Sequence, residues 1–305
     1  MKLKTLILTF LIFIATSCVY SQFDKPIFQL GIGISQPFDQ LKGGNLYYYG
    51  TYPNSPFPIT LIDSSFLRDN YGAKTGFNVF GSAKINFDKY NISRGLITLS
   101  YNSFSTFEGD EVGTVPFRTL QGDLLQNVTY SYSFTNLTIG FGLEVAPLSF
   151  TNVVSPFFNT TFNINFLSAS LTRTESVYDS IKADFGPEVR LGLGFNAGIE
   201  ARVSKQIGVV LGVKYDMANL LLKQDARGFS ERAIFGREGI PLNDEGGEYW
   251  TNLPYYGGEY PGLANANPKK INFGTIYLAL NFYPEMKKTT SKDSKSPKNY
   301  RLYYR

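Results

Sequence analysis

Eight segments of the chain alternate apolar and polar residues with a period of two. In the clearest of them, every second residue from Val189 to Val203 is apolar, and the residues between are glycine, asparagine or charged. Successive side chains of a β-strand point to opposite faces, so this period predicts strands and is incompatible with helices. The eight segments span about 27–36, 76–88, 94–105, 127–146, 155–168, 189–203, 207–216 and 271–283.

The connections between these segments alternate between long and short. Long connections fall at about 37–75, 106–126, 169–186 and 218–269, and short ones at about 89–93, 147–154 and 204–206. Up-and-down barrels of outer membranes have short turns on one side and long loops on the other. The pattern therefore predicts an all-β fold, an eight-stranded antiparallel up-and-down transmembrane β-barrel with long extracellular loops.

Alternation alone does not decide whether the apolar face points to lipid or, as in a secreted soluble barrel, to the centre. The polar faces are rich in glycine, asparagine and serine, and charged residues make up only 18% of the chain, against roughly 25% in soluble proteins. Aromatic residues near strand ends are typical of membrane interfaces. Here they are Phe28, Phe87, Tyr215, Phe282 and Tyr283. We therefore expect the apolar face to contact lipid in the cell outer membrane.

The segment 127–146 changes phase in its middle. Its apolar residues keep one phase from Val128 to Phe134 and the opposite phase from Leu137 to Val145. A β-bulge near Thr135 would restore a single apolar face. Alternatively, the first half of the strand rises above the membrane.

The N-terminal residues have the pattern of a secretion signal. Lys2 and Lys4 precede an apolar stretch from Leu6 to Ala15, which is too short to span a bilayer as a helix. We expect residues 1–21 to be a signal peptide, residues 22–284 the barrel, and residues 285–305 a basic, disordered periplasmic tail. Cys18, the only cysteine, is either removed with the signal or carries a lipid.

Seven charged residues occupy the polar faces of the predicted strands. The interior of an eight-stranded barrel is just wide enough for side chains to fill, and buried charges must pair. We predict an ion-pair network that closes the lumen, centred between segments 189–203 and 207–216; the alternative is a polar pathway for a small solute. The seven residues are Lys84, Glu144, Arg190, Glu200, Arg202, Lys214 and Asp216.

Composition argues against several kinds of chemistry. The chain has no histidine, so it cannot form a Ser-His-Asp site, and zinc binding is disfavoured as well. We expect no enzyme activity and assign no catalytic, cofactor-binding or metal-binding residue. A net charge of +4 is too small and too scattered to indicate nucleic-acid binding.

The last long connection carries acidic and aromatic residues. We interpret Asn243, Asp244, Glu245 and Glu248 as solvated loop charge, with calcium binding as the alternative. The aromatic residues either pack on one another or form a patch for a glycan or protein partner, because aromatic side chains are strong contact anchors. They are Tyr249, Trp250, Tyr255, Tyr256 and Tyr260.

The chain resembles small outer-membrane β-barrel proteins of the OmpA/OmpX-like class, and especially the PorT-like barrel-domain family common in Bacteroidota. The residues that carry the resemblance are the Val19–Gln22 junction, the run 192–216 and the last strand at 272–284. The resemblance implies an eight-stranded barrel with a periplasmic N-terminus and no single shared activity.

Two functions are compatible with these features. The first is a non-enzymatic barrel that acts as a membrane-anchored scaffold or binding protein through its extracellular loops. The second is a narrow pore or transporter for small solutes. Outer-membrane lipid is the one partner that both require, and the sequence gives no oligomeric state.

Overall fold

The computed structural model describes residues 26–43, 47–51, 58–62, 69–87, 92–106, 110–119, 122–146, 154–175, 181–225, 242–250 and 263–284. The predicted signal peptide, Cys18 and the basic tail lie outside these ranges. Within them, no helix is both long and apolar enough to cross a bilayer.

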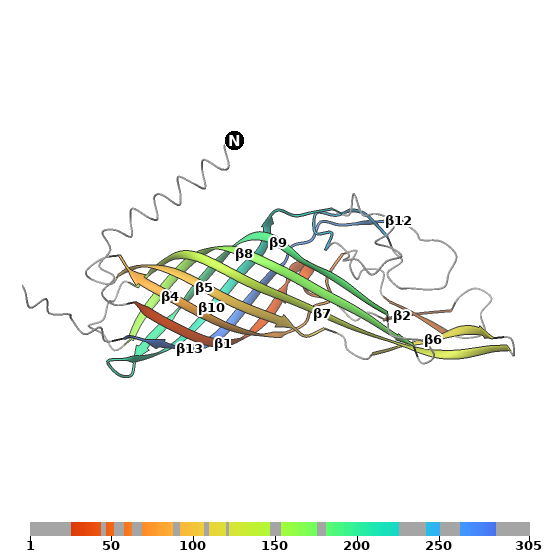
Figure 1. Cartoon of the computed structure of the whole chain (residues 1–305), viewed down its shortest axis with the longest axis horizontal. Coiled ribbons are helices and arrows are strands. Elements are labelled where there is room, and N and C mark those ends of the chain that lie inside the picture. The colour runs from red at the N-terminus through yellow and green to blue at the C-terminus, as the bar shows by residue number, and fades with distance from the viewer. Residues whose placement is uncertain are drawn as a thin grey trace, which may run out of the picture.

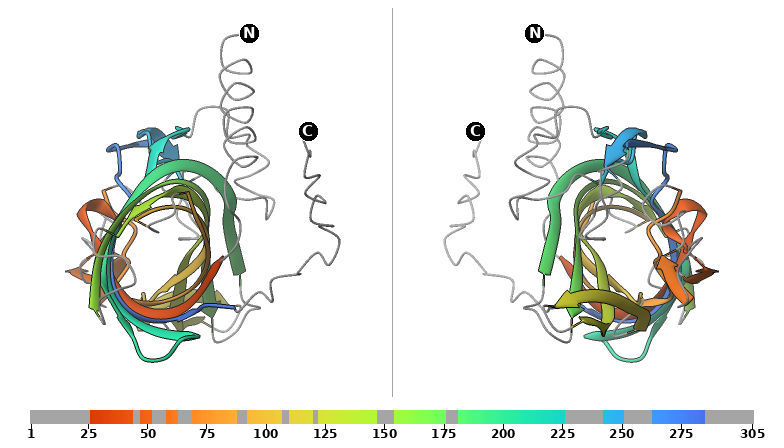
Figure 2. Two further views of the ribbon diagram at one scale, coloured as in Figure 1. Left: turned by 90° about the vertical axis from the view of Figure 1, so that its left-hand side faces the viewer. Right: turned by 90° about the vertical axis from the view of Figure 1, so that its right-hand side faces the viewer.

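Eight antiparallel strands form a closed ring. Each pairs with its neighbours in the order β1-β4-β5-β7-β8-β9-β10-β13, and β13 pairs with β1 to close the barrel. Figure 2 shows this ring along its axis. The strands are β1 (Ile27–Phe38), β4 (Gly76–Asn86), β5 (Ser93–Phe104), β7 (Gly122–Val145), β8 (Val154–Glu175), β9 (Ile181–Arg202), β10 (Ile207–Leu221) and β13 (Asn272–Phe282). The eight-stranded antiparallel barrel predicted from the sequence is confirmed.

Shorter elements lie in the long connections. A 3₁₀ turn, η1 (Asp39–Leu41), follows β1, and β6 (Asp110–Thr119) pairs with the start of β7. The pairs β2 (Tyr47–Thr51) with β3 (Pro58–Ile62) and β11 (Gly247–Trp250) with β12 (Leu263–Ala266) form two small sheets. In Figure 1, β2, β6 and β12 are all at the long-loop end of the barrel.

The prediction of polar loops at 106–126 and 169–186 is wrong. The first range holds β6 and the beginning of β7, and the second holds the ends of β8 and β9. These residues continue the ladder beyond the barrel, because each strand's backbone finds a partner in its neighbour. Figure 1 shows β7, β8 and β9 running past the other strands at this end.

The apolar face of the strands points outward. In the middle of β1, Ile32 is 66% exposed, while Gln29 on the opposite face is 3% exposed. Water would not tolerate such a continuous apolar belt, whereas lipid solvates it, so the soluble-barrel alternative is excluded. Other members of the belt are Leu30, Ile34, Phe77, Val79, Leu99, Leu143, Phe158, Ile199, Leu211, Val213, Ile276 and Leu278. The chain is a transmembrane β-barrel of the outer-membrane type.

Four of the five aromatic residues expected at the membrane interface lie on the outer surface, and one does not. Phe28, Phe87, Tyr215 and Phe282 are exposed on the outside, but Tyr283 is buried and points into the barrel. Tyr283 follows Phe282 directly, and adjacent residues of an extended chain point to opposite faces.

The bulge predicted near Thr135 is absent. β7 keeps one continuous register with β5 and with β8 through this point. The phase change arises instead because Tyr132 and Phe134 are buried inside the barrel, below the part of β7 that pairs with β6. A register shift does occur between β8 and β9, at Leu167 and Ala169, close to the positive-φ residue Gly186.

Candidate functional site

The lumen is the candidate functional site. Buried, paired charged side chains close its end near the short turns. Glu144 on β7 accepts hydrogen bonds from Lys84 on β4 at 2.7 Å and from Arg94 on β5 at 2.8 Å. Asn159 on β8 donates to the same carboxylate at 3.2 Å. The three charged side chains are almost fully buried, so each one depends on the others for the polar contacts that water would otherwise give.

A second carboxylate extends this cluster across the barrel. Arg94 reaches Glu200 on β9 at 3.4 Å, and Glu200 also accepts a hydrogen bond from the Tyr283 hydroxyl. The Arg202 guanidinium lies 4.3 Å from the centre of the Tyr283 ring, within cation–π range. We call these four residues, together with Lys84 and Glu144, the lower cluster. It joins β4, β5, β7 and β9 and the residue that follows β13.

An apolar layer covers the lower cluster. Phe157, Val210 and Tyr277 are buried together, and Phe80 meets the Tyr277 ring edge-on at 4.9 Å between ring centres. Gly212 makes room for this ring, since a Cβ built there would lie 2.4 Å from the Tyr277 side chain. Gly212 is paired with Tyr277 on the adjacent strand, and a narrow barrel can hold a large side chain only where a neighbouring position is small.

Small polar side chains fill the middle of the lumen. Asn78 donates to Ser100 at 2.7 Å and to Asn102 at 2.9 Å, and Ser35 donates to Asn102 at 2.9 Å. On the opposite wall, Asn163 donates to Asp216 at 2.9 Å, and Lys214 lies 3.0 Å from the same carboxylate. Predicted network members Lys214 and Asp216 thus pair with each other in the middle layer.

Aromatic rings form the next layer toward the long loops. Phe104 meets Phe273 at 5.3 Å and Phe134 at 6.1 Å between ring centres. Tyr71, from the connection between β1 and β4, packs on Phe134 at 5.4 Å and is fully buried. Burial raises the pKa of Tyr71 well above its usual value, and its hydroxyl donates to the Leu242 carbonyl at 2.9 Å.

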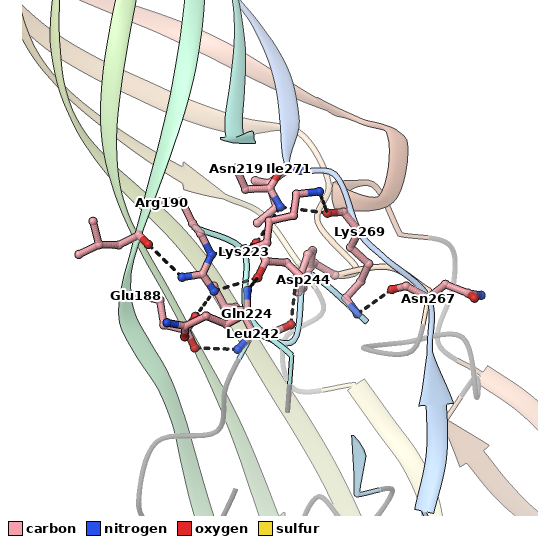
Figure 3. A network of polar contacts seen from close by, with 12 residues as sticks. Glu188, Arg190, Asn219, Lys223, Gln224, Leu242, Asp244, Asn267, Lys269 and Ile271 are labelled. Carbon is pink, nitrogen blue, oxygen red and sulfur yellow. Dashed lines mark hydrogen bonds and ion pairs between the residues drawn. The ribbon is translucent and has the colours of Figure 1, made fainter. Parts of the chain in front are cut away.

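A loop segment closes the mouth above this layer. The segment Leu242–Gly246, from the connection between β10 and β13, places Asp244 where it is fully buried. Arg190 on β9 donates to both carboxylate oxygens of Asp244, at 2.8 and 2.9 Å. Asn219 on β10 donates to Asp244 at 2.9 Å and to the Lys269 carbonyl at 2.9 Å, as Figure 3 shows.

Further contacts fix the same segment. Glu188 pairs with Arg190 and accepts from the Leu242 amide at 2.8 Å, while the Gln224 amide donates to Asp244 at 3.1 Å. Figure 3 shows these groups converging from two strands and two loops. We call Glu188, Arg190, Asn219, Asp244 and Lys269 the upper cluster.

The predicted centre of the ion-pair network is wrong. Arg190 and Glu200 are ten residues apart on one strand, which is roughly 30 Å at about 3.3 Å per residue, so they lie at opposite ends of the lumen. Arg202 belongs with Glu200 and Tyr283 at the lower end. The seven predicted residues therefore divide among a lower cluster, a middle pair and an upper cluster.

Sequence reasoning missed two central residues. Arg94 lies on the inward phase of β5, opposite to Ile97 and Leu99, so strand parity could have identified it. Asp244 was expected to be solvated loop charge, and this is wrong because the loop folds into the barrel mouth. Both oxygens of Asp244 already accept hydrogen bonds, which leaves this carboxylate unavailable to a calcium ion.

The predicted aromatic patch stays a prediction. Tyr249 and Trp250 belong to β11, where they pair in register with Ala264 and Leu263. Tyr255, Tyr256 and Tyr260 lie outside the described residues.

Comparison with known proteins finds distant likenesses among solved outer-membrane barrels. Neisserial surface protein A (NspA) has 11% identity and a TM-score of 0.39, covering 84% of this chain and 96% of its own. Ail, the attachment invasion locus protein of Yersinia pestis, has 9% identity and a TM-score of 0.30, covering 85% and 99%. A major outer membrane protein from Thermus thermophilus has 10% identity and a TM-score of 0.35, covering 85% and 99%.

No protein-family model and no curated protein matches the chain. The structural similarities are too low to transfer a role to it.

The lower cluster generates a stability prediction. Glu144→Gln removes the carboxylate shared by Lys84 and Arg94 and leaves buried positive charge behind, so we expect the free energy of unfolding to fall by about 3–5 kcal/mol. Urea unfolding in lipid vesicles measures this change. Lys205→Gln, in an exposed turn, is the control. The double variant Lys84→Met/Glu144→Gln should recover part of the loss. A Glu144→Gln barrel as stable as the control would contradict the assignment.

The upper cluster generates a prediction about pH. Burial lowers the pKa of Lys269 to about 8, although Asp244 and Asp69 partly oppose the shift. Between about pH 8 and 10.5 the folded chain therefore binds fewer protons than the unfolded one, so stability rises with pH across this window. Relative to Lys269→Met, the wild-type free energy of unfolding should increase there by on the order of 3 kcal/mol. A difference that stays constant from pH 7.5 to 10.5 would count against a buried ammonium group.

Proposed function

We propose that this protein is a non-conducting, non-enzymatic barrel of the outer membrane that acts as a membrane-anchored scaffold and binds partners through its extracellular loops. The observation that carries the proposal is the filled lumen. Side chains occupy it from Arg202 and Tyr283 at one end to Arg190 and Asp244 at the other.

The competing function, a narrow pore for small solutes, needs a continuous polar path. Two layers interrupt such a path: the apolar side chains around Phe157 and Tyr277, and the rings of Phe104, Phe134 and Phe273. An ion that crosses either layer loses its water without gaining polar contacts, which is costly. The geometry thus favours a closed barrel over a conduit.

A scaffold also needs an accessible surface to which partners can bind. β6, β7, β8 and β9 continue as one sheet beyond the barrel, where β6 pairs with β7 and residues 169–173 of β8 pair with residues 181–185 of β9. The pairing of β10 with β9 stops at Leu191, so among the described strands only β8 pairs with β9 above that point. A strand edge of this kind supports binding by addition of a partner's strand.

The likeness to the PorT-like family of Bacteroidota remains part of this proposal. It rests on the runs 192–216 and 272–284, which form β9, β10 and β13. The absence of histidine from the sequence supports a non-enzymatic role.

Conductance tests the closed lumen. Purified protein in a planar bilayer should carry no steady current. Asp244→Ala should also carry none, because the Phe104, Phe134 and Phe273 layer lies beneath the loop that it releases. A heat-induced shift on a gel verifies that each barrel is folded. A steady ohmic current through the wild-type protein would overturn the proposal in favour of a pore.

Truncation of the raised sheet tests partner binding. Replacing residues 170–184 by a short Gly-Ser turn removes the raised part of the β9 edge and its partner region on β8, without touching the register of β8 against β9 from Val154 to Leu167. The shortened barrel should still fold and still shift on heating. Partners that are chemically cross-linked to the wild-type protein on intact cells should be lost. An unchanged set of cross-linked partners would show that the sheet is not the binding surface.

A further inference from the structure

Three exposed lysines stand at the long-loop rim of three adjacent strands. Lys270 precedes β13, Lys42 follows β1 and η1, and Lys74 precedes β4, and these strands are neighbours in the order β13-β1-β4. Strands in a sheet lie about 4.8 Å apart, so the three positions cover an arc of about 10 Å. We call these residues the lysine arc.

The fold directs all three lysines away from the lumen. In each segment the preceding residue is buried and the lysine is exposed: Leu41 before Lys42, Ala73 before Lys74 and Lys269 before Lys270. The buried residues help to close the barrel mouth. The same turns that close the lumen therefore place a positive charge on the outer surface of the rim.

Backbone contacts hold the arc together. Lys42 forms a parallel bridge with Ala73, and the Gly43 amide donates to the Ala73 carbonyl at 3.1 Å. The Lys270 amide donates to the Gln40 side chain at 3.1 Å, and the Lys74 amide donates to the Ser105 carbonyl at 2.7 Å. The three lysines are thus anchored on ordered backbone rather than on independent loops.

Two acidic residues in the same connections as the arc already have donors. Asp39 accepts from Asn272 at 2.5 Å, and Asp69 accepts from Asn267 at 2.8 Å. Within the part of the chain that the structure describes, no ion pair is made by Lys42, Lys74 or Lys270.

The arc lies just beyond the lipid-facing belt. Phe38 and Tyr215 are exposed on the outer wall with ring centres 6.1 Å apart, and Phe77 and Tyr101 form a similar pair at 6.2 Å. Exposed aromatic residues at strand ends mark the level of lipid headgroups. Cations directly beyond them lie at the depth of headgroup phosphates.

We propose that the lysine arc binds the phosphate groups of an outer-leaflet glycolipid, with the acyl chains lying on the apolar wall of β13, β1 and β4. Ile276, Ile32 and Val79 on that wall are all exposed. Continuity between the arc and this apolar wall favours a lipid over free phosphate. The inference rests on the orientation in the proposed function, in which the long loops face the outside.

Native mass spectrometry of the delipidated full chain in detergent tests this site. The probe is a diphosphorylated lipid A. Each lysine near an anionic surface contributes about fivefold in affinity, so Lys42→Gln/Lys74→Gln/Lys270→Gln should weaken binding roughly 100-fold. Lys205→Gln, an exposed lysine at the opposite end of the barrel, should bind as the wild type does. The heat shift on a gel shows that the triple variant is folded.

Two further binding measurements show whether the ligand is a phosphorylated lipid, the lipid alone or free phosphate. Dephosphorylated lipid A should bind the wild type as weakly as diphosphorylated lipid A binds the triple variant, and inorganic phosphate at equal concentration should not compete. The proposal is overturned if the triple variant retains wild-type affinity, if the dephosphorylated lipid binds equally well, or if free phosphate competes fully. In micelles the result depends neither on membrane orientation nor on conductance, so its failure is separable from failure of the proposed function.

Discussion

Backbone pairing in lipid is the constraint on which the rest of this structure depends. A strand in the hydrocarbon region has no water to satisfy its N–H and C=O groups, so the sheet must close on itself. Closure of β13 onto β1 with eight strands fixes the width of the lumen. The residues that face inward must then be small, mutually hydrogen-bonded or ion-paired, and the lower cluster, the polar middle and the upper cluster meet this requirement in turn.

The two charged clusters serve different parts of the molecule. The lower cluster consists largely of strand residues and ties opposite walls of the barrel through Arg94 and Glu144. The upper cluster joins strand residues to a loop, because Arg190 binds Asp244 from the connection between β10 and β13. Loop closure over the mouth therefore depends on one buried carboxylate, that of Asp244.

Most of the barrel could be predicted from the sequence because period-two alternation records which face meets lipid. It placed all eight strands and the inward direction of Lys84, Glu144 and Arg190. The alternation could not reveal how a loop folds back into the barrel or where along a strand the lipid belt ends. The burial of Asp244 depends on where a loop folds, and the inward turn of Tyr132 and Phe134 depends on where the lipid belt ends. Strand extensions at 169–186 were missed because their polar residues resemble loop sequence, although their backbone is paired.

The filled lumen is tested most directly by thiol accessibility in a Cys18→Ser background. Ser100→Cys places a thiol in the middle polar layer, where the native side chain is 2% exposed, and Gln206→Cys places one in an exposed turn. With a charged, water-soluble thiol reagent, the cysteine at 206 should react rapidly in the folded barrel. The cysteine at 100 should react only after heat unfolding. Comparable reaction rates at the two positions in the folded protein would show that water and solutes enter the lumen, and would contradict a closed barrel.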